Sequence, residues 1–250
     1  MKMKNAIFGL CTVALSFLAQ ADEVLVAVAA NFAAPMQIFA AEFEKETGHK
    51  VIVSLGSTGK LYAQIVNGAP YELFLSADSE TPRRLAQEGF GLEASRFTYG
   101  LGKLVLWSAD PALVDAQGLV LKRGSFKRIA LANPKTAPYG AAALSVLRHL
   151  DLFNTLQPRF VQGENISQAY QFASTGAAEL GFVALSQVMV DGQLVSGSAW
   201  RVPEHFYAPI RQDALLLNKG KDRQVALAML AYLKATKAQA VIRGYGYTTP

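Results

Sequence analysis

The chain has 250 residues, 51% of them hydrophobic, and a single cysteine, Cys11. That length allows one large domain or two small ones with a sizeable core. A basic start (Lys2, Lys4), an apolar run over 6–18 and a small-x-small triplet at 19–21 predict a cleaved secretory signal peptide over residues 1–21. Because Cys11 lies inside it, the expected mature chain has no thiol, which excludes disulfides, thiolate metal sites and a cysteine nucleophile.

The charge balance argues against nucleic-acid binding. Without the two lysines of the signal peptide, Lys and Arg number 22 (24 minus 2) against 19 Asp and Glu, a net charge of about +3. The excess is scattered, with short basic pairs at 83–84 and 122–123 and no aromatic residues between them. No nucleic acid is therefore expected as a partner, and such a surface gives at most modest steering of small anions.

The first part of the mature chain alternates strands and helices. The apolar alternation of Val24, Val26 and Val28 predicts a buried strand, and Gly48 is a natural residue to follow the end of the first helix. The expected elements, in order, are a strand at 24–28, a helix at 33–47, a strand at 51–53, a helix through 61–66, a strand at 71–76 and a helix at 81–88. This order indicates a parallel sheet wrapped by helices.

A second unit of the same kind is predicted within the first. After a strand at 104–107 comes a polar stretch, 109–126, without strong periodicity. The remaining expected elements are strands at 128–132, 159–162, 179–184 and 206–218, and helices at 139–150, 166–174, 223–234 and 238–245. We interpret the chain as α/β, with two doubly wound lobes, 22–102 with 206–250 and 103–205, joined by two crossings near 100–103 and 204–209.

Four junctions between a strand and the following helix share one chemistry. They carry small, neutral, hydrogen-bonding residues, and two belong to each predicted lobe. In doubly wound sheets such junctions converge at the carboxyl ends of the strands, and helix N-termini with hydroxyl or amide donors suit an ionised oxyanion. The candidate binding residues are Asn31, Ser57, Thr58, Tyr139 and Ile166. The alternative for any one junction is helix capping without a ligand, for which Asn31 is a preferred residue type.

Other motifs do not predict chemistry. The segment GSTGKL at 56–61 departs from a phosphate-binding loop, because Ser54 stands where its first glycine belongs and Leu61 where its Ser or Thr belongs. The three histidines, at 49, 149 and 205, are far apart and have no metal-ligand partners at useful spacing. No cofactor and no free metal cation are expected.

Candidate catalytic and amino-acid-binding groups also have simpler interpretations. Asp78 follows a strand, where it could act as an acid, but its position suits a cap of the next helix. Ser57 has no evident His and Asp partners and lies in no G-x-S-x-G elbow. Arg211 and Asp213, a pair of the kind that binds an amino acid, both lie on the returning strand.

Several segments in one order resemble a known family along essentially the whole mature chain. They are VAVAANFAAPM at 26–36, GSTGKLYAQI at 56–65, GAPYELFLSAD at 68–78, LANPKTAPYG at 131–140, ENI at 164–166, LGFVALS at 180–186 and YGY at 245–247. In these segments the chain resembles the periplasmic molybdate-binding proteins of ABC-type molybdate importers. The resemblance implies a hinged, two-lobed fold of the type II periplasmic binding proteins that closes on molybdate or tungstate.

The resemblance also assigns roles to the candidate residues. It implies that Asn31 donates through its backbone and side chain, that Thr58 with Ser57 beside it forms the second contact, and that Tyr139 and Ile166 donate backbone amides. Some members carry a tyrosine whose hydroxyl reaches the anion at a position that is Ala184 here. Either the Tyr139 hydroxyl replaces that donor or the site has one donor fewer.

The expected function is that of a secreted, monomeric solute receptor in the periplasm. It would bind molybdate or tungstate between its lobes, present it to a membrane ABC permease, and perform no chemistry of its own. One alternative is a receptor for sulfate, thiosulfate or another tetrahedral oxyanion. The other is an enzyme on the same fold, with Asp78 or Tyr139 in an acid/base role.

Overall fold

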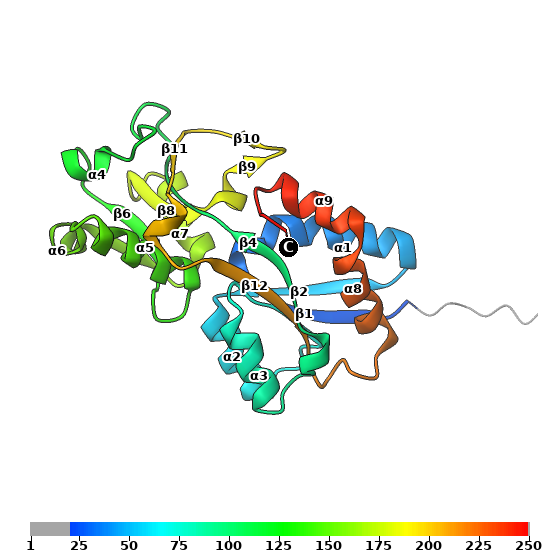
Figure 1. Ribbon diagram of the computed structural model, residues 1–250. Helices are drawn as coiled ribbons and strands as arrows, with labels where there is room; N and C mark the ends of the chain where they lie inside the picture. The colour runs from blue at the N-terminus through cyan, green and yellow to red at the C-terminus, as the bar shows by residue number, and fades with distance from the viewer. Residues whose placement is uncertain (1–20, 250) are drawn as a thin grey trace, which may run out of the picture.

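The computed structural model describes residues 21–249, which form two lobes, each built on a five-stranded sheet (Figure 1). The first sheet has the order β2-β1-β3-β12-β4 and the second β11-β5-β8-β6-β7. The predicted signal peptide, with Cys11, lies outside the described residues except for Ala21. The α/β class and the two-lobe architecture are confirmed.

The first lobe combines the two ends of the described chain. Its strands are β1 (Glu23–Ala29), β2 (Lys50–Gly56), β3 (Leu73–Leu75), β4 (Phe97–Gly102) and β12 (Ile210–Leu216). Helices α1 (Ala33–Thr47), α8 (Gln224–Lys234) and α9 (Thr236–Gly244) cover one face, and α2 (Thr58–Val66) and α3 (Glu80–Gln87) cover the other (Figure 1). Gly48, predicted to follow the first helix, adopts the left-handed conformation there with φ 74°.

The second lobe has the same kind of architecture. Its sheet contains β5 (Leu104–Ser108), β6 (Ile129–Ala132), β7 (Phe160–Gly163), β8 (Leu180–Ala184) and β11 (Ser198–Arg201). Its helices are α4 (Val120–Arg123), α5 (Pro138–His149), α6 (Phe153–Leu156) and α7 (Ile166–Ser174), and a hairpin of β9 (Met189–Val190) and β10 (Gln193–Leu194) extends from it. Short 3-10 segments η1 to η5 span Ala30–Phe32, Glu93–Ser95, Gln157–Arg159, Leu185–Gln187 and Glu204–Phe206.

Both sheets are mixed, so the predicted parallel pairing holds for only part of each sheet. β1 pairs in parallel with β2 and β3, and β6 pairs in parallel with β7 and β8. β12 is antiparallel to β3 and β4, and β5 is antiparallel to β8 and β11. The strands that run against the others are β5 and β12, and each directly follows a crossing between the sheets, β5 after Lys103 and β12 after 202–209.

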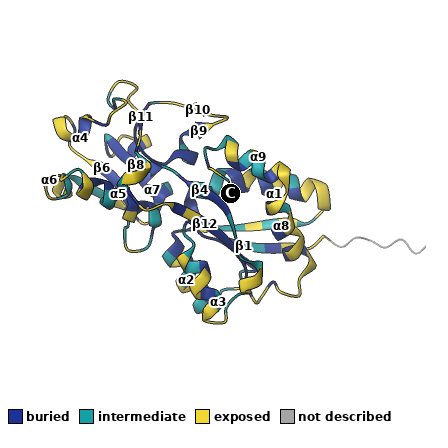
Figure 2. Cartoon of the chain, viewed as in Figure 1, coloured by how far each residue is buried: buried dark blue, intermediate teal, exposed yellow. Residues whose placement is uncertain are grey.

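Strand alternation places the core on both faces of the first sheet. Val24, Val26 and Val28 of β1 pack with Phe39 of α1 and the C-terminal helices, whereas Ala27 packs toward α2 and α3. Figure 2 shows the resulting buried strands between exposed helix surfaces. Successive side chains of a strand point to opposite faces, so β1 is packed against helices on both sides up to the point where the chain turns toward α1.

Within residues 21–249 no helix by itself has the length and apolar composition to cross a membrane. Taken together, α8 and α9 pass by length and composition, with a 60° bend between them.

Candidate functional site

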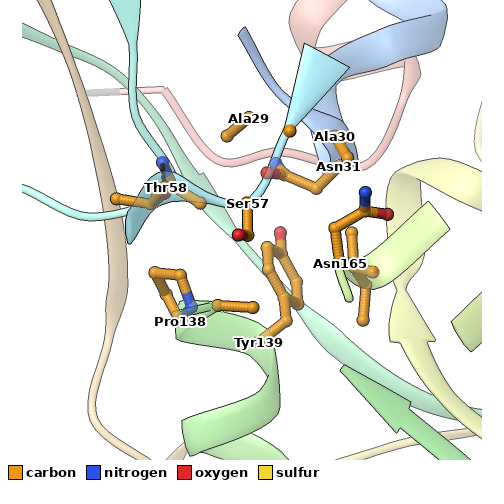
Figure 3. Close-up of a pocket in the computed structure, with 12 residues that line it drawn as sticks. Ala29, Ala30, Asn31, Ser57, Thr58, Pro138, Tyr139 and Asn165 are labelled. Carbon is orange, nitrogen blue, oxygen red and sulfur yellow. Dashed lines mark hydrogen bonds between the residues drawn. The ribbon is translucent and has the colours of Figure 1, made fainter. Parts of the chain in front are cut away.

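The four predicted junctions meet in one small pocket between the lobes (Figure 3). All five predicted residues line it, within a set of twelve: Ala29, Ala30, Asn31, Gly56, Ser57, Thr58, Ala77, Ala137, Pro138, Tyr139, Asn165 and Ile166. The cavity is small: the centre of a water molecule has about 10 Å³ of room there, which is about what one water molecule needs. None of these lining residues carries a charged side chain.

Asn31 lies in the 3-10 turn η1 between β1 and α1, and it is not a helix cap. The N-cap of α1 is Phe32, and no side chain caps it. Instead the Asn31 amide is buried and its Nδ2 donates to Gln212 Oε1 at 2.8 Å and to the Tyr247 hydroxyl at 2.9 Å. Its Oδ1 is buried without a partner. The 3-10 turn inserted before α1 explains why the capping expectation was wrong.

The second junction joins β2 to α2 and contributes two hydroxyl groups. Ser57 is the extended N-cap residue of α2 but makes no side-chain capping bond, and its Oγ is buried without a partner. Thr58 Oγ1 accepts a hydrogen bond from the Ala77 amide at 3.1 Å, which leaves the hydroxyl proton of Thr58 available as a donor. Both hydroxyls therefore have unused hydrogen-bonding capacity at the pocket.

Tyr139 belongs to the first turn of α5, after Pro138, whose ring suits a helix start. Its hydroxyl accepts a hydrogen bond from Gln212 Nε2 at 3.1 Å, and Figure 3 shows it pointing toward Ser57 and Asn31. Burial raises the pKa of the Tyr139 hydroxyl well above its ordinary value. The group therefore stays protonated and neutral at physiological pH.

The fourth junction is the start of α7, where Asn165 is a true helix cap. Its Oδ1 accepts from the Gln168 amide at 3.1 Å. Asn165 was not among the predicted residues, although it stands inside the ENI segment next to Ile166. A preferred capping residue directly before a predicted helix was the signal that could have identified it.

Backbone amides complete the donor set. Thr58 and Ile166 are the first residues of their helices and Tyr139 is the second. The N–H groups of a first helical turn have no partner within the helix and lie at the positive end of its dipole. Three such ends, with the hydroxyl groups of Ser57 and Thr58, give a neutral site rich in donors, which is suited to a small anion.

Hydrogen bonds join the two lobes around the pocket. The Gly59 amide donates to the Thr136 carbonyl at 2.9 Å, and Ser167 Oγ donates to the Ala30 carbonyl at 3.1 Å. On another side Ser186 Oγ donates to the Asn31 carbonyl at 2.8 Å. At the surface, Lys60 pairs with Glu164. The structure therefore holds the lobes in contact around the site.

Three other residues considered from the sequence, Asp78, Asp213 and Ala184, lie outside the pocket lining. Asp78 accepts from the Thr81 amide at 2.8 Å, so it satisfies the start of α3, and burial raises the pKa of its carboxyl. Asp213 was considered with Arg211 as a pair that could bind an amino acid. Its carboxylate is instead paired with Arg96 of the first lobe at 2.7 Å. Ala184 caps η4 and does not line the pocket either.

The histidines are closer together than expected. The rings of His149 and His205 lie 6.0 Å apart and both contact Phe206, so the expectation that all three histidines are far apart was wrong for this pair. The helix α5 and the crossing before β12 bring them together. Within residues 21–249 no group of three or more His, Cys, Asp or Glu side chains could hold a metal ion.

Comparisons with known proteins agree with this fold and pocket. A family model described as "Bacterial extracellular solute-binding protein" matches residues 24–248. The molybdate-binding protein ModA of Azotobacter vinelandii is 59% identical over 233 residues, 93% of this chain and 92% of that protein. That of Rhodobacter capsulatus is 50% identical over 235 residues, covering 94% and 92%.

A solved structure gives the same result in three dimensions. The periplasmic molybdate-binding protein of Azotobacter vinelandii superposes with a TM-score of 0.88 at 45% sequence identity, covering 91% of this chain and 99% of that one. The resemblance noted in the sequence is therefore confirmed. The chain belongs to the bacterial extracellular solute-binding proteins, in the group that includes these molybdate-binding proteins.

Proposed function

We propose that this protein is a periplasmic receptor that binds molybdate, and also tungstate, and presents it to the permease of an ABC-type importer. The observation that carries the proposal is the convergence of neutral donors from both lobes in a small pocket whose lining bears no charged side chain. Relatives that are 59% and 50% identical are named molybdate-binding proteins, and this supports the choice of ligand.

The proposed contacts follow from the chemistry of a dianion. Molybdate at neutral pH carries no proton, so it accepts hydrogen bonds and is repelled by acceptors. Asn31, Ser57 and Thr58 of the first lobe and the amides of Tyr139 and Ile166 of the second would donate to its oxygens. Each such bond to a charged acceptor is worth roughly 1.5–3 kcal/mol, so donors from both lobes make the closed form the tight-binding one.

Size, not charge, would separate molybdate from sulfate. Both are tetrahedral dianions, but molybdate is larger, so a pocket closed around it leaves sulfate with long hydrogen bonds, which weaken with length and angle. Tungstate, nearly the size of molybdate, would bind as well. Phosphate is partly protonated at neutral pH and needs an acceptor, and a site built from donors does not favour it.

In this account the lobes, 22–102 with 206–250 and 103–205, move about the two crossings and close on the anion. The receptor acts as a monomer without catalysis, and the leader over 1–21 directs it to the periplasm. The enzyme alternative is less well supported, because Asp78 lies outside the pocket lining and because burial raises the pKa of Tyr139, so that its hydroxyl keeps its proton and is a weak acid.

Calorimetric titration of the stripped mature protein tests the proposal. We expect saturable binding of molybdate and tungstate at one site per chain, with sulfate and phosphate weak or silent. Tight sulfate binding would keep the anion site but favour the alternative of a sulfate or thiosulfate receptor. If none of the four anions bound, the junctions would be helix starts without a ligand.

Replacing Thr58 by alanine should weaken molybdate binding by ~1.5–3 kcal/mol, because it removes a hydroxyl donor to a charged ligand. Ile166→Ala is the matched comparison from the opposite lobe. Since only its backbone amide is proposed to reach the anion, Ile166→Ala should lose clearly less affinity than Thr58→Ala. Calorimetry on both variants checks this, and equal losses would refute the assignment of side-chain and backbone donors.

Affinity for tungstate should be nearly constant between about pH 6.5 and about pH 9, because no group at the site titrates in that range. Burial raises the pKa of Tyr99, Tyr139 and Tyr247 above the ordinary value of tyrosine, so these hydroxyls keep their protons throughout. A titration series across this range provides the check. A fall in affinity with a midpoint below pH 9 would mean that one of these tyrosines ionises.

A further inference from the structure

Gln212 is the centre of a buried polar network behind the pocket. It is 0% exposed on β12, and the strand register shifts between Gln212 and Asp213, so two consecutive polar side chains are buried. Gln212 Oε1 accepts from Asn31 Nδ2 and from the Tyr99 hydroxyl, each at 2.8 Å. Its Nε2 donates to the Tyr139 hydroxyl at 3.1 Å. One carboxamide thus touches a candidate binding residue of each lobe.

This arrangement gives Asn31 the wrong polarity for an anion. With Nδ2 engaged by Gln212 and Tyr247, the amide atom left over is Oδ1, which is buried without a partner. Asn31 lines the pocket, so an oxyanion there would meet a carbonyl oxygen. Two acceptors facing each other repel, and a buried acceptor without a donor is itself unfavourable.

Asn31 cannot correct this by turning alone. Rotating its amide by half a turn would place Oδ1 against Gln212 Oε1, which exchanges one pair of opposed acceptors for another. If both amides turn, Gln212 Nε2 donates to Asn31 Oδ1 and to the Tyr99 hydroxyl. Tyr99 already has an acceptor for its own proton in the Ser76 carbonyl at 2.7 Å.

The turned arrangement satisfies every member of the network. Tyr247 can donate to Asn31 Oδ1, and the Tyr139 hydroxyl donates to Gln212 Oε1 instead of accepting from Nε2. The one group left without a protein partner is Asn31 Nδ2, a donor at the pocket. The two amides have the same shape with oxygen and nitrogen exchanged, so this needs no movement of the surrounding core.

We propose that Gln212 is a positioning residue of the oxyanion site: in the anion-bound form Gln212 Nε2 donates to Asn31 Oδ1, and this directs Asn31 Nδ2 at the anion. This inference rests on the proposed function and adds a residue to it. It also decides between the two alternatives raised by Ala184. The Tyr139 hydroxyl gives its proton to Gln212, so Tyr139 binds the anion through its backbone amide and the site has one donor fewer.

Gln212→Glu and Gln212→Met test this role by tungstate titration. A carboxylate at 212 only accepts, so it holds Asn31 Nδ2 and fixes Oδ1 toward the anion; we expect affinity ~100-fold below wild type at pH 8. Protonation of this carboxylate gives it one donor and one acceptor again, so the affinity of Gln212→Glu should recover at pH 5.5. Gln212→Met leaves Asn31 free to turn and should lower the affinity ~10-fold at both pH values.

Gln168→Glu is the control for added charge. It places a carboxylate near the start of α7, and its affinity should stay within about threefold of wild type.

A spectroscopic measurement separates positioning from simple charge repulsion. In 15N-labelled wild-type protein the side-chain amide resonances of Gln212 and Asn31, assigned with Gln212→Met and Asn31→Asp, should both shift on saturation with tungstate, because Asn31 Nδ2 gains the anion as an acceptor and Gln212 is hydrogen-bonded directly to Asn31. A Gln212 resonance that stays in place, or a methionine variant weaker than the glutamate variant at pH 8, would overturn the role of Gln212. Wild-type protein that binds neither tungstate nor molybdate would instead overturn the proposed function.

Discussion

Gly102→Ala is expected to weaken molybdate binding by ~2 kcal/mol or more, about thirtyfold, as overpacking of a filled core does. A Cβ at Gly102 would overlap the Tyr139 hydroxyl and Gln212 Nε2, and would lie 3.0 Å from Tyr139 Cζ. Both side chains are buried. The substitution therefore displaces the two groups behind the pocket, and calorimetric titration with molybdate measures the effect.

Gly100→Ala is the matched control, two residues earlier on the same strand β4. A Cβ there would lie 3.3 Å from Tyr247 Cδ1 and 3.5 Å from Ile242 Cγ2, which needs a shift of only a few tenths of an ångström. We expect a loss of affinity below about 0.5 kcal/mol. Equal losses for the two variants would show that the strand, and not the space at Gly102, determines the effect.

Gly140→Ala should destabilise the folded protein by ~3 kcal/mol or more, although alanine normally favours a helix over glycine by about 1 kcal/mol. Gly140 is in the first turn of α5, and a Cβ there would overlap the Ala132 carbonyl oxygen and approach its carbon to 2.8 Å. Backbone atoms of β6 cannot move aside cheaply. Denaturant unfolding monitored by circular dichroism gives the free energy of unfolding.

Ser145→Ala, later in the same helix, controls for helix propensity. Ser145 is only half-buried, so this variant should match wild type or gain stability by up to about 0.5 kcal/mol. If Gly140→Ala were as stable as Ser145→Ala, the close packing of α5 against β6 would not be important for stability.

The local parts of the site were predictable from the sequence. Each predicted junction ends a short apolar strand and begins a helix, and both patterns are visible over a few residues. Asn31, Thr58, Tyr139 and Ile166 therefore stood out, and they do line one pocket. The prediction that they converge depended on one general rule: parallel strands present their carboxyl ends at one edge of a sheet.

The network behind the pocket could not be predicted in this way. Gln212 and Tyr247 lie 181 and 216 residues from Asn31 in the sequence, and no local pattern links positions so far apart. Gln212 also faces inward because of a shift in strand register, which alternation alone does not indicate. The sequence pattern also did not indicate the 3-10 turn that places Asn31 before the N-cap of α1, because this turn continues directly into the helix.

The strand directions were also beyond the sequence pattern. An alternation of strands and helices indicates parallel pairing, but β4 and β5 follow each other across Lys103 into different sheets. Whether a strand continues into a neighbouring lobe depends on long-range packing. The same crossings bring His149 next to His205.

The most direct test of the account is an anomalous difference map from crystals of the mature protein grown with tungstate, recorded at a tungsten absorption edge. The account predicts one strong peak per chain in the pocket, within hydrogen-bonding reach of the amides of Tyr139 and Ile166 and of the Asn31, Ser57 and Thr58 side chains. A peak at another place on the chain, or a peak coordinated by charged side chains, would contradict it.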